Sequence, residues 1–243
     1  MKMNGTAKGG VSVSAMPLSS PWIMQNINLW DSVTGGASLE SYEREEIIYE
    51  QGEQMDCVYV VKSGRVRLSS VGCGGNEQIF MFMEQGSMFG ETDFYERGLR
   101  VCRATAICRT TLYRVELDDF RRQLEENLDF CHNLMALWSQ KLNLLTGRIE
   151  SLAFTDTYSR CAQVLLNLME MYGEKVDGGY RIGVEVTHQN MANLVTSTRV
   201  TINKIIRRMV QEGLIARDSG HYVIRDVEGL RKIVGSQYTD SSL

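Results

Sequence analysis

A short run of basic side chains near the C-terminus carries the clearest chemistry in this sequence. Arg199, Lys204, Arg207 and Arg208 fall within ten residues that contain no acidic side chain. An arginine can donate two hydrogen bonds to O6 and N7 of guanine, an asparagine such as Asn203 can pair with adenine, and a valine can contact the methyl group of thymine. These residue types suit the major groove of double-stranded DNA. The alternative is a solvated basic face on an ordinary core helix.

Two helices and a hairpin are predicted to position this basic run. Thr187 and Thr198 each precede a helical pattern and suit the N-cap position. The apolar residues at helical spacing are Met191, Leu194 and Val195 in the first helix, and Ile202, Ile205, Ile206 and Met209 in the second. A predicted hairpin follows, with strands at 214–217 and 222–224 and a turn at 218–220. Helix, turn, helix and hairpin form a winged helix-turn-helix, which favours the DNA interpretation over the solvated face.

The predicted DNA contacts divide into base contacts and phosphate contacts. Residues of the second helix face the bases, whereas Arg208, the threonine hydroxyls and the helix N-termini suit phosphates. The complete predicted set is Thr187, His188, Gln189, Thr198, Arg199, Val200, Thr201, Asn203, Lys204 and Arg208.

The segment from about Ser41 to Glu116 has the pattern of an antiparallel β structure. Short apolar runs alternate with glycines about every ten to twelve residues, which is typical of a sandwich or barrel with hairpin turns. The predicted strands include 47–49, 58–61, 66–68, 79–82 and 112–115. Cys102 and Cys108 are predicted to share one strand and one face, as core residues or as a thiol switch.

A long helix is predicted from about Leu117 to Leu152. Its apolar residues repeat at alternating steps of three and four, and this seam consists of Met135, Trp138, Leu142, Leu145, Ile149 and Leu152. The seam either packs on the protein's own β domain or meets an identical helix. A regular heptad seam on a long helix favours the two-fold homodimer.

Composition excludes some classes of protein. The chain has a net charge of −4 and 43% hydrophobic residues, the profile of a soluble globular protein, and no apolar run is long enough to span a membrane. No signal peptide is seen at the N-terminus, so we expect a cytoplasmic protein with reduced cysteines. No nucleophile–base set, phosphate loop or metal motif is present, so we expect no enzyme. A binding module that decorates a complex remains the non-enzymatic rival.

The sequence resembles the Crp/Fnr family of bacterial transcription regulators from about Trp30 to Lys232. The stretches that carry the resemblance, in order, are Tyr59–Val66, Gly86–Glu91, Ala162–Leu168 and Thr187–Ile206. The resemblance implies an α+β fold with a jelly-roll-like, cyclic-nucleotide-binding-like β-roll, a long dimerisation helix and a C-terminal winged helix-turn-helix. It also implies a near-palindromic promoter site and contact with RNA polymerase. The expected divisions are a disordered arm at 1–20, an effector-sensing roll at 21–116, the helix at 117–153 and the DNA-binding domain at 154–243.

The resemblance also implies an effector pocket formed by Gly90, Glu91, Arg100, Val101, Leu145 and Thr146. Cyclic-AMP-binding members place a serine after the arginine and a Thr-Ser pair on the helix, whereas this chain has Val101 and Leu145-Thr146. Fewer donors would leave a cyclic phosphate poorly paired, so these differences disfavour cyclic AMP and leave open another nucleotide or small anion. Glu91 and Arg100 could equally form a structural ion pair or be exposed loop charges.

Other cofactors of the family fit the sequence less well. The first cysteine is Cys57, inside the roll, so no iron–sulfur cluster is expected. No histidine lies in the roll, so haem would need a cysteine ligand. In the second reading helix, Val200 and Lys204 replace the family's Glu and second Arg, which predicts a half-site richer in A·T.

Overall fold

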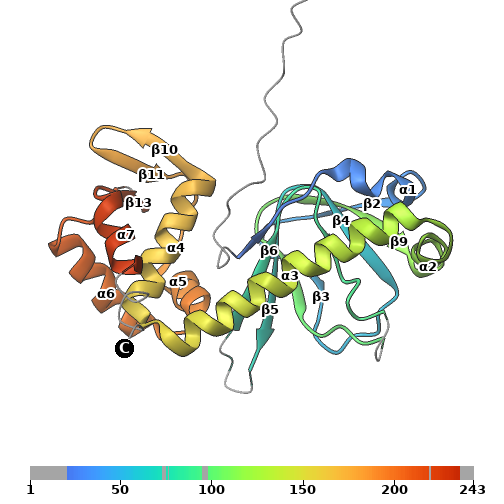
Figure 1. The fold of residues 1–243 in the computed structure, drawn as a ribbon, viewed down its shortest axis with the longest axis horizontal. Helices are drawn as coiled ribbons and strands as arrows, with labels where there is room; N and C mark the ends of the chain where they lie inside the picture. The colour runs from blue at the N-terminus through green and yellow to red at the C-terminus, as the bar shows by residue number, and fades with distance from the viewer. Residues whose placement is uncertain (1–20, 73–74, 76, 95–97, 219, 236–243) are drawn as a thin grey trace, which may run out of the picture.

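The computed structural model describes residues 21–72, 75, 77–94, 98–218 and 220–235. An N-terminal β-roll and a C-terminal mixed domain lie at opposite ends of the molecule, and one long helix, α3, runs along the roll from its far end to the C-terminal domain (Figure 1). This arrangement is the predicted α+β architecture. Within the described residues, no helix has the length and apolar character needed to cross a bilayer. The predicted arm at 1–20 lies outside the described residues.

The roll consists of two sheets that enclose an apolar core. One sheet has the strand order β2-β9-β4-β7 and the other β1-β6-β5-β8-β3. All pairs are antiparallel except β1 with β6. The strands are β1 (Trp22–Ile23), β2 (Ser38–Tyr42), β3 (Ile47–Tyr49), β4 (Cys57–Ser63), β5 (Val66–Val71), β6 (Glu77–Met83), β7 (Met88–Phe89), β8 (Arg103–Ala106) and β9 (Thr110–Glu116), with a 3-10 helix at Ile27–Trp30 and α1 at Asp31–Thr34. The five predicted strands are thereby confirmed.

Glycines make the turns of the roll, as the spacing predicts. Gly52, Gly64 and Gly86 all have positive φ, near +85°, which disfavours any side chain. Gly86 is also crowded, because a Cβ built there would lie 2.0 Å from the carbonyl oxygen of Gln25. The carbonyl of Gly86 accepts a 2.8 Å hydrogen bond from the indole of Trp30, so this turn is tied to the core.

The single helix predicted over 117–152 is wrong, because the structure has two helices there. α2 (Leu117–Glu126) ends before Asn127, and α3 (Leu128–Phe154) begins after it. Asn127 has an extended backbone, and its side-chain oxygen accepts a hydrogen bond from the amide of Phe130. An asparagine that caps a new helix stops the preceding one, because its side chain satisfies a free amide of the next helix.

The C-terminal domain contains four helices and a four-stranded sheet in the order β10-β11-β13-β12. The elements are α4 (Thr157–Tyr172), β10 (Gly173–Val176), β11 (Gly179–Ile182), α5 (His188–Val195), α6 (Arg199–Gln211), β12 (Ile215–Asp218), β13 (His221–Ile224) and α7 (Val227–Gly235). The alternating residues from Tyr180 to Val186 predict one strand there, but β11 ends at Ile182 and pairs with β10, which the pattern does not predict. The buried core of the C-terminal domain also includes Trp22, Ile79 and Phe82 from the roll, so the two domains pack together.

The predicted placement of Cys102 and Cys108 on one strand is wrong. β8 spans only Arg103–Ala106, so the two cysteines flank it at opposite ends. Cys102 is buried, and its burial raises the pKa of the thiol to about 11, which keeps it protonated and weakly nucleophilic. The geometry fits core residues better than a paired switch.

The crowding at Gly86 gives a test of the fold with a matched control. Gly86→Ala combines a backbone penalty of about 1–2 kcal/mol with overpacking that costs roughly 1–3 kcal/mol more. Gly52→Ala carries the backbone penalty alone, because nothing lies within 4 Å of its Cβ position. Urea unfolding followed by tryptophan fluorescence should therefore show a clearly lower midpoint for Gly86→Ala. Equal midpoints for the two variants would contradict the described packing of the Gly86 turn.

Candidate DNA-reading helix and effector pocket

The two helices of the reading element begin as predicted. The hydroxyl of Thr187 accepts a 3.1 Å hydrogen bond from the amide of Asn190, and that of Thr198 accepts one of 3.1 Å from the amide of Thr201. Thr196 has a left-handed backbone, φ 55°, which turns the chain sharply between α5 and α6. Buried apolar residues, among them Ala192 and Ile202, hold the two helices together.

The outward face of α6 is free of acidic partners. Arg199, Val200 and Lys204 are exposed, with Val200 at 67%, and Thr201 and Asn203 are half-buried beside them. Within the described residues, no ion pair involves Arg199, Lys204 or Arg207. Polar residues at the starts of the two helices are exposed as well, namely Thr187, Gln189 and Thr198. We call Arg199, Val200, Asn203 and Lys204 the recognition face.

Arg208 does not belong to the recognition face but lies on the side of α6 that meets α4. Its Nε donates a 2.8 Å hydrogen bond to Glu212, and its guanidinium stacks over the ring of Tyr158 on α4. The Tyr158 hydroxyl also contacts Glu212. Arg208 therefore joins α6 to α4 in an exposed surface network, which uses its Nε–H and the face of its guanidinium.

The hairpin adds a cation that sequence analysis missed. Arg217 on β12 lies 3.2 Å from Nε2 of His188 on α5 and stacks on the ring of Tyr222. Burial, and then the positive charges of Arg217, Arg199 and Arg207, lower the pKa of His188, so its imidazole is neutral at neutral pH. The hairpin thus places Arg217 beside the start of α5, and this contact follows from the register of the hairpin.

The predicted effector residue Glu91 is buried and bound to the long helix. Its side chain is 0% exposed, and Oε1 accepts hydrogen bonds from Lys141 Nζ at 2.7 Å and from Trp138 Nε1 at 3.1 Å. Lys141 also donates to the carbonyl of Met88 at 3.1 Å. The second carboxylate oxygen, Oε2, has no hydrogen-bond partner among the described residues.

Arg100 is buried as well, which rules out the exposed-loop alternative. Its guanidinium donates to the carbonyls of Gly90 at 3.1 Å and Cys57 at 2.8 Å and stacks on the ring of Tyr49 at 4.2 Å. Asp93 lies 3.9 Å away as a buried counter-ion. The Nε atom has no hydrogen-bond partner among the described residues. Glu91 and Arg100 thus each keep one buried polar atom unpaired.

The other four predicted pocket residues contribute differently. Gly90 has φ +82°, and its carbonyl is one of the acceptors of Arg100. Val101 is 57% exposed and carries no side-chain donor. Leu145 and Thr146 are exposed on α3, on the side of the helix that the roll leaves uncovered. The structure therefore brings Glu91 and Arg100 into the roll interior, while the helix pair faces outward from this chain.

Most of the seam on α3 is left uncovered by the described part of the chain. The roll covers a neighbouring stripe of the helix formed by Phe130, Leu134, Leu137, Lys141 and Leu144. Within the seam, Leu142 is 65% and Ile149 68% exposed, and Met135 is 53% exposed. Trp138 is the seam residue that reaches inward, to Glu91. The helix thus presents one apolar stripe to the roll and a second one to solvent.

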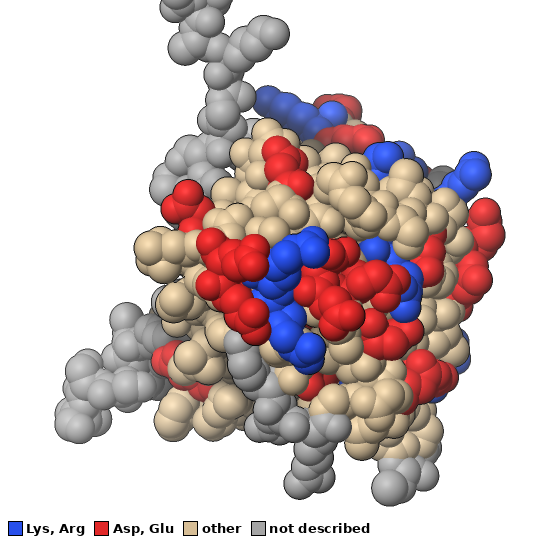
Figure 2. Space-filling view, turned by 90° about the vertical axis from the view of Figure 1, so that its right-hand side faces the viewer, with Lys and Arg blue, Asp and Glu red and all other residues tan. Residues whose placement is uncertain are grey.

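Charge separates the two ends of the molecule. Figure 2 shows the end of the roll away from the C-terminal domain, where acidic side chains gather around a few basic ones. On the elements at this end, Arg114 pairs with Asp56 at 2.7 Å and Glu40 at 3.6 Å, and Arg122 pairs with Asp119. Such a surface repels phosphate, whereas Arg199, Lys204 and Arg207 on α6 have no ion pair among the described residues. In the described residues, no group of three or more potential ligands could hold a metal ion.

Comparison with known proteins agrees with this geometry. Residues 39–127 match the family model of the cyclic nucleotide-binding domain, and residues 159–233 match that of the Crp-like helix-turn-helix domain. The chain is 26% identical over 191 residues to the CRP-like cAMP-activated global transcriptional regulator of Mycobacterium tuberculosis, which covers 79% of this chain and 85% of the relative.

Two further relatives are similar over most of their length. The global nitrogen regulator of Synechococcus elongatus is 28% identical over 180 residues, covering 73% of this chain and 81% of that protein. A crystal structure of a CRP/FNR-family transcriptional regulator from Thermus thermophilus superposes with a TM-score of 0.67 at 26% identity, covering 82% of this chain and all of that one. With both domains matched in the order that the fold requires, this chain belongs to the Crp/Fnr family of effector-responsive, DNA-binding transcription regulators.

Proposed function

We propose that this regulator acts as a homodimer that places its two recognition faces in successive major grooves of a near-palindromic promoter site. The observation that carries the proposal is the exposed, acid-free recognition face on α6, held by two capped helices. Binding in successive major grooves requires the two symmetry-related α6 helices to lie about 34 Å apart, one turn of B-DNA. Bound at a promoter, the dimer would contact RNA polymerase, as the family resemblance implies.

The residue types of the recognition face support an A·T-rich half-site. Arg199 at the helix start can fork onto one guanine, and Asn203 can pair with adenine. Val200 offers only a methyl contact, which suits thymine. Lys204 is a point charge that reaches a phosphate or a single acceptor, unlike a planar guanidinium.

The exposed seam supports the homodimer. A soluble chain gains from burying large apolar side chains such as Leu142 and Ile149, at about 25 cal/mol per Å² removed from water. An identical helix presents the same heptad pattern, so the seam is complementary to itself across a two-fold axis. The same two-fold axis then relates the two recognition faces, as binding to a palindrome requires.

The effector is proposed to occupy the roll beside Glu91 and Arg100. Their unpaired atoms are an acceptor, Glu91 Oε2, and a donor, Arg100 Nε, both in a desolvated site. A small ligand with a hydroxyl or amino group and an acceptor or anionic group would satisfy both. Cyclic AMP fits less well, because the two terminal nitrogens of Arg100 already bond to carbonyls and Val101 adds no donor.

A route from this pocket to the dimer runs through the long helix. A ligand that bonds to Oε2 of Glu91 shares this carboxylate with Lys141 and Trp138, which donate to Oε1, and Trp138 belongs to the seam. At the other end of α3, Arg148 donates to the carbonyls of Phe80 on the roll and Leu194 on α5. A small shift of α3 would therefore move both the seam and the contacts that α3 makes with the reading element. The two states must differ in ligand affinity for this coupling to work.

The recognition face is tested by single substitutions measured against selected DNA. From random duplexes a preferred site is first enriched, and affinity is then titrated over a range of salt concentrations. Arg199→Ala should weaken specific binding by about 1–3 kcal/mol and relax the preference at one base pair. Lys204→Ala should lower the salt slope by about one phosphate contact. The control is Arg231→Ala, an exposed arginine on α7 already paired with Glu228. If all three variants bind like the wild type, the proposal fails.

The seam is tested by placing a charge at an exposed position. Leu142→Glu costs the single chain little, because the side chain is 65% exposed, but it places like charges together across a two-fold axis. Sedimentation should show monomers for Leu142→Glu and dimers for Asn143→Glu, which carries the same charge on the adjacent exposed residue. Asn143→Glu should melt like the wild-type dimer. A dimer that survives Leu142→Glu unchanged would place the interface elsewhere.

The effector pocket is tested by thermal shift with purified protein. Cyclic AMP at millimolar concentration should leave the melting temperature unchanged, whereas a true effector raises it by linkage. Any compound that does so should lose its effect in Glu91→Gln and keep it in Glu40→Gln, an equivalent change at a partly exposed carboxylate on β2. A large shift with cyclic AMP that depends on Glu91 would overturn the proposed ligand class.

A further inference from the structure

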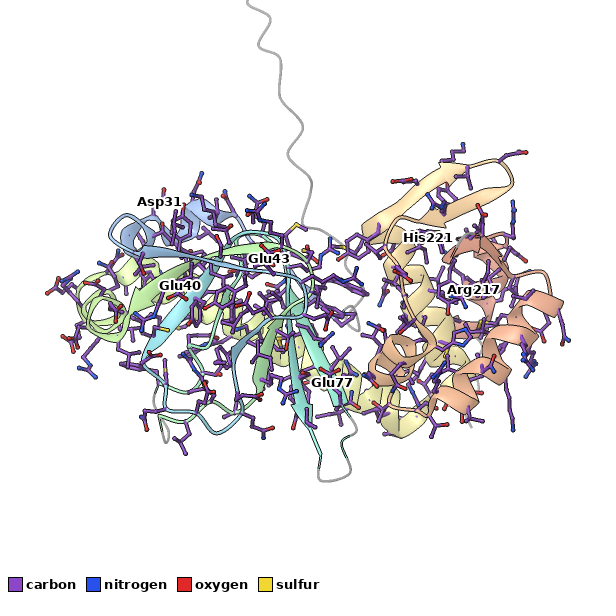
Figure 3. All side chains as sticks on the ribbon, turned by 180° about the vertical axis from the view of Figure 1, so that it is seen from behind. Asp31, Glu40, Glu43, Glu77, Arg217 and His221 are labelled. Carbon is purple, nitrogen blue, oxygen red and sulfur yellow. The ribbon has the colours of Figure 1, made fainter. Side chains whose placement is uncertain are left out.

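A histidine and an arginine meet at the edge of the reading element, where α5 begins beside the hairpin of β12 and β13. Nε2 of His188 lies 3.2 Å from a terminal nitrogen of Arg217. Arg217 is exposed and His188 is half-buried, so both can be reached from solvent. Figure 3 shows Arg217 in the C-terminal domain, together with His221 of the same hairpin.

The contact between the two side chains fixes the protonation state of the histidine. A guanidinium has donors only, so Nε2 of His188 must accept the hydrogen bond from Arg217. The imidazole is therefore neutral in this arrangement, with its one proton on Nδ1. A second proton, on Nε2, would set two donors and two positive charges against each other and break the contact.

The hairpin holds Arg217 in its place beside His188. The guanidinium lies over the ring of Tyr222, 4.9 Å from the ring centroid, and its second terminal nitrogen is 3.4 Å from the carbonyl oxygen of Gly220. Tyr222 is buried and lies directly opposite Arg217 in the register of β12 and β13. Arg217 is therefore a pre-organised cation at the start of α5.

The charges that act on His188 are all positive. Burial, and then Arg217 on β12 and Arg199 and Arg207 on α6, lower the pKa of His188 below the usual histidine value. The next residue of β12, Asp218, lies opposite His221 in the strand register. In the described part of the chain, no carboxylate forms an ion pair with His188. The surrounding cations thus disfavour the imidazolium until an anion is brought to them.

DNA supplies such an anion in the proposed function. Arg199 belongs to the recognition face, so a duplex that engages this face brings phosphates to the same side of the domain. A phosphate beside Arg217 and His188 offsets their repulsion, because an opposite charge within about 4–6 Å favours the charged form of a titratable group. A proton taken from solvent then binds Nε2, which donates to a phosphate oxygen and no longer accepts from Arg217.

We propose that Arg217 and His188 form a proton-dependent phosphate clamp, so that DNA binding takes up a proton at His188 and strengthens as the pH falls. This inference rests on the proposed binding of DNA by the recognition face. The complex holds the proton more tightly than the free protein. Affinity therefore rises as the pH falls through the pKa of His188 in the complex, and it stops rising below the lower pKa of the free protein.

The test measures the affinity of the full-length protein for the enriched duplex at fixed salt, between about pH 8 and about pH 5.5, where histidine titrates. The affinity of the wild type should rise roughly tenfold over this range, because each protomer adds up to one proton. Calorimetry in two buffers of different ionisation enthalpy should show net proton uptake on binding. The salt dependence should also steepen at the acidic end, because each new imidazolium neutralises one phosphate.

Three variants locate the proton. His188→Gln keeps an acceptor for Arg217 but cannot titrate, so its affinity should no longer rise on acidification. Arg217→Gln removes the nearest cation, so it should raise the pKa of His188 in the free protein, measured by NMR of the imidazole nitrogens, and reduce the gain in affinity. His132→Gln, a change at an exposed histidine on α3, is the control and should keep the full gain.

The possible results separate this inference from the proposed function. A wild type that binds no duplex specifically at any pH would contradict the proposed function, and the clamp with it. Specific binding with an affinity that stays constant over the pH range, or a full gain in His188→Gln, would overturn the clamp alone. A gain that disappears in His221→Gln and persists in His188→Gln would place the proton on the other histidine of the C-terminal domain.

Discussion

Glu91 is a carboxylate with no exposed surface, and the arrangement of the whole chain follows from how its charge is compensated. An unpaired buried carboxylate costs several kcal/mol, so a cation must be brought to it. That cation is Lys141, and it comes from α3 rather than from the roll. The long helix is consequently fixed against the roll at one rotation about its own axis. This rotation decides which of its apolar stripes is covered and which is left for a partner.

The two stripes of α3 show how one helix serves two interfaces. Leu134, Leu137 and Leu144 share the side of Lys141 and are buried, whereas Leu142 and Ile149 lie on the exposed side. Trp138 lies at the border, and its indole bonds to the same carboxylate oxygen as Lys141. Compensation of a buried charge and presentation of a dimer seam are therefore properties of the same turn of helix. A change at Glu91 cannot be absorbed by the roll alone.

Local patterns predicted the parts of the molecule that local physics determines. Thr187 and Thr198 are N-caps because a side-chain oxygen there satisfies a free amide, and this depends only on neighbours in sequence. The heptad seam and the alternation of the strands are equally local. The break at Asn127 was missed because the apolar pattern continues through it, and only the cap hydrogen bond shows that a new helix begins. The strand at β11 was predicted too long because strand length depends on the partner strand, and β10 was missed because it has no apolar alternation.

The sequence predicted which residues form the candidate sites better than it predicted the partners that those residues contact. Glu91 and Arg100 were identified from the family's motif, but neither Lys141 nor Trp138 has a sequence signal that links it to residue 91, since the contact joins positions about fifty residues apart. Arg208 was assigned to DNA by charge alone, although Glu212 and Tyr158 already engage it. The contact between Arg217 and His188 also has no sequence signal, because the register of the wing fixes it. Charge and spacing thus indicate which residues can act, whereas packing decides which of them remain available to a ligand.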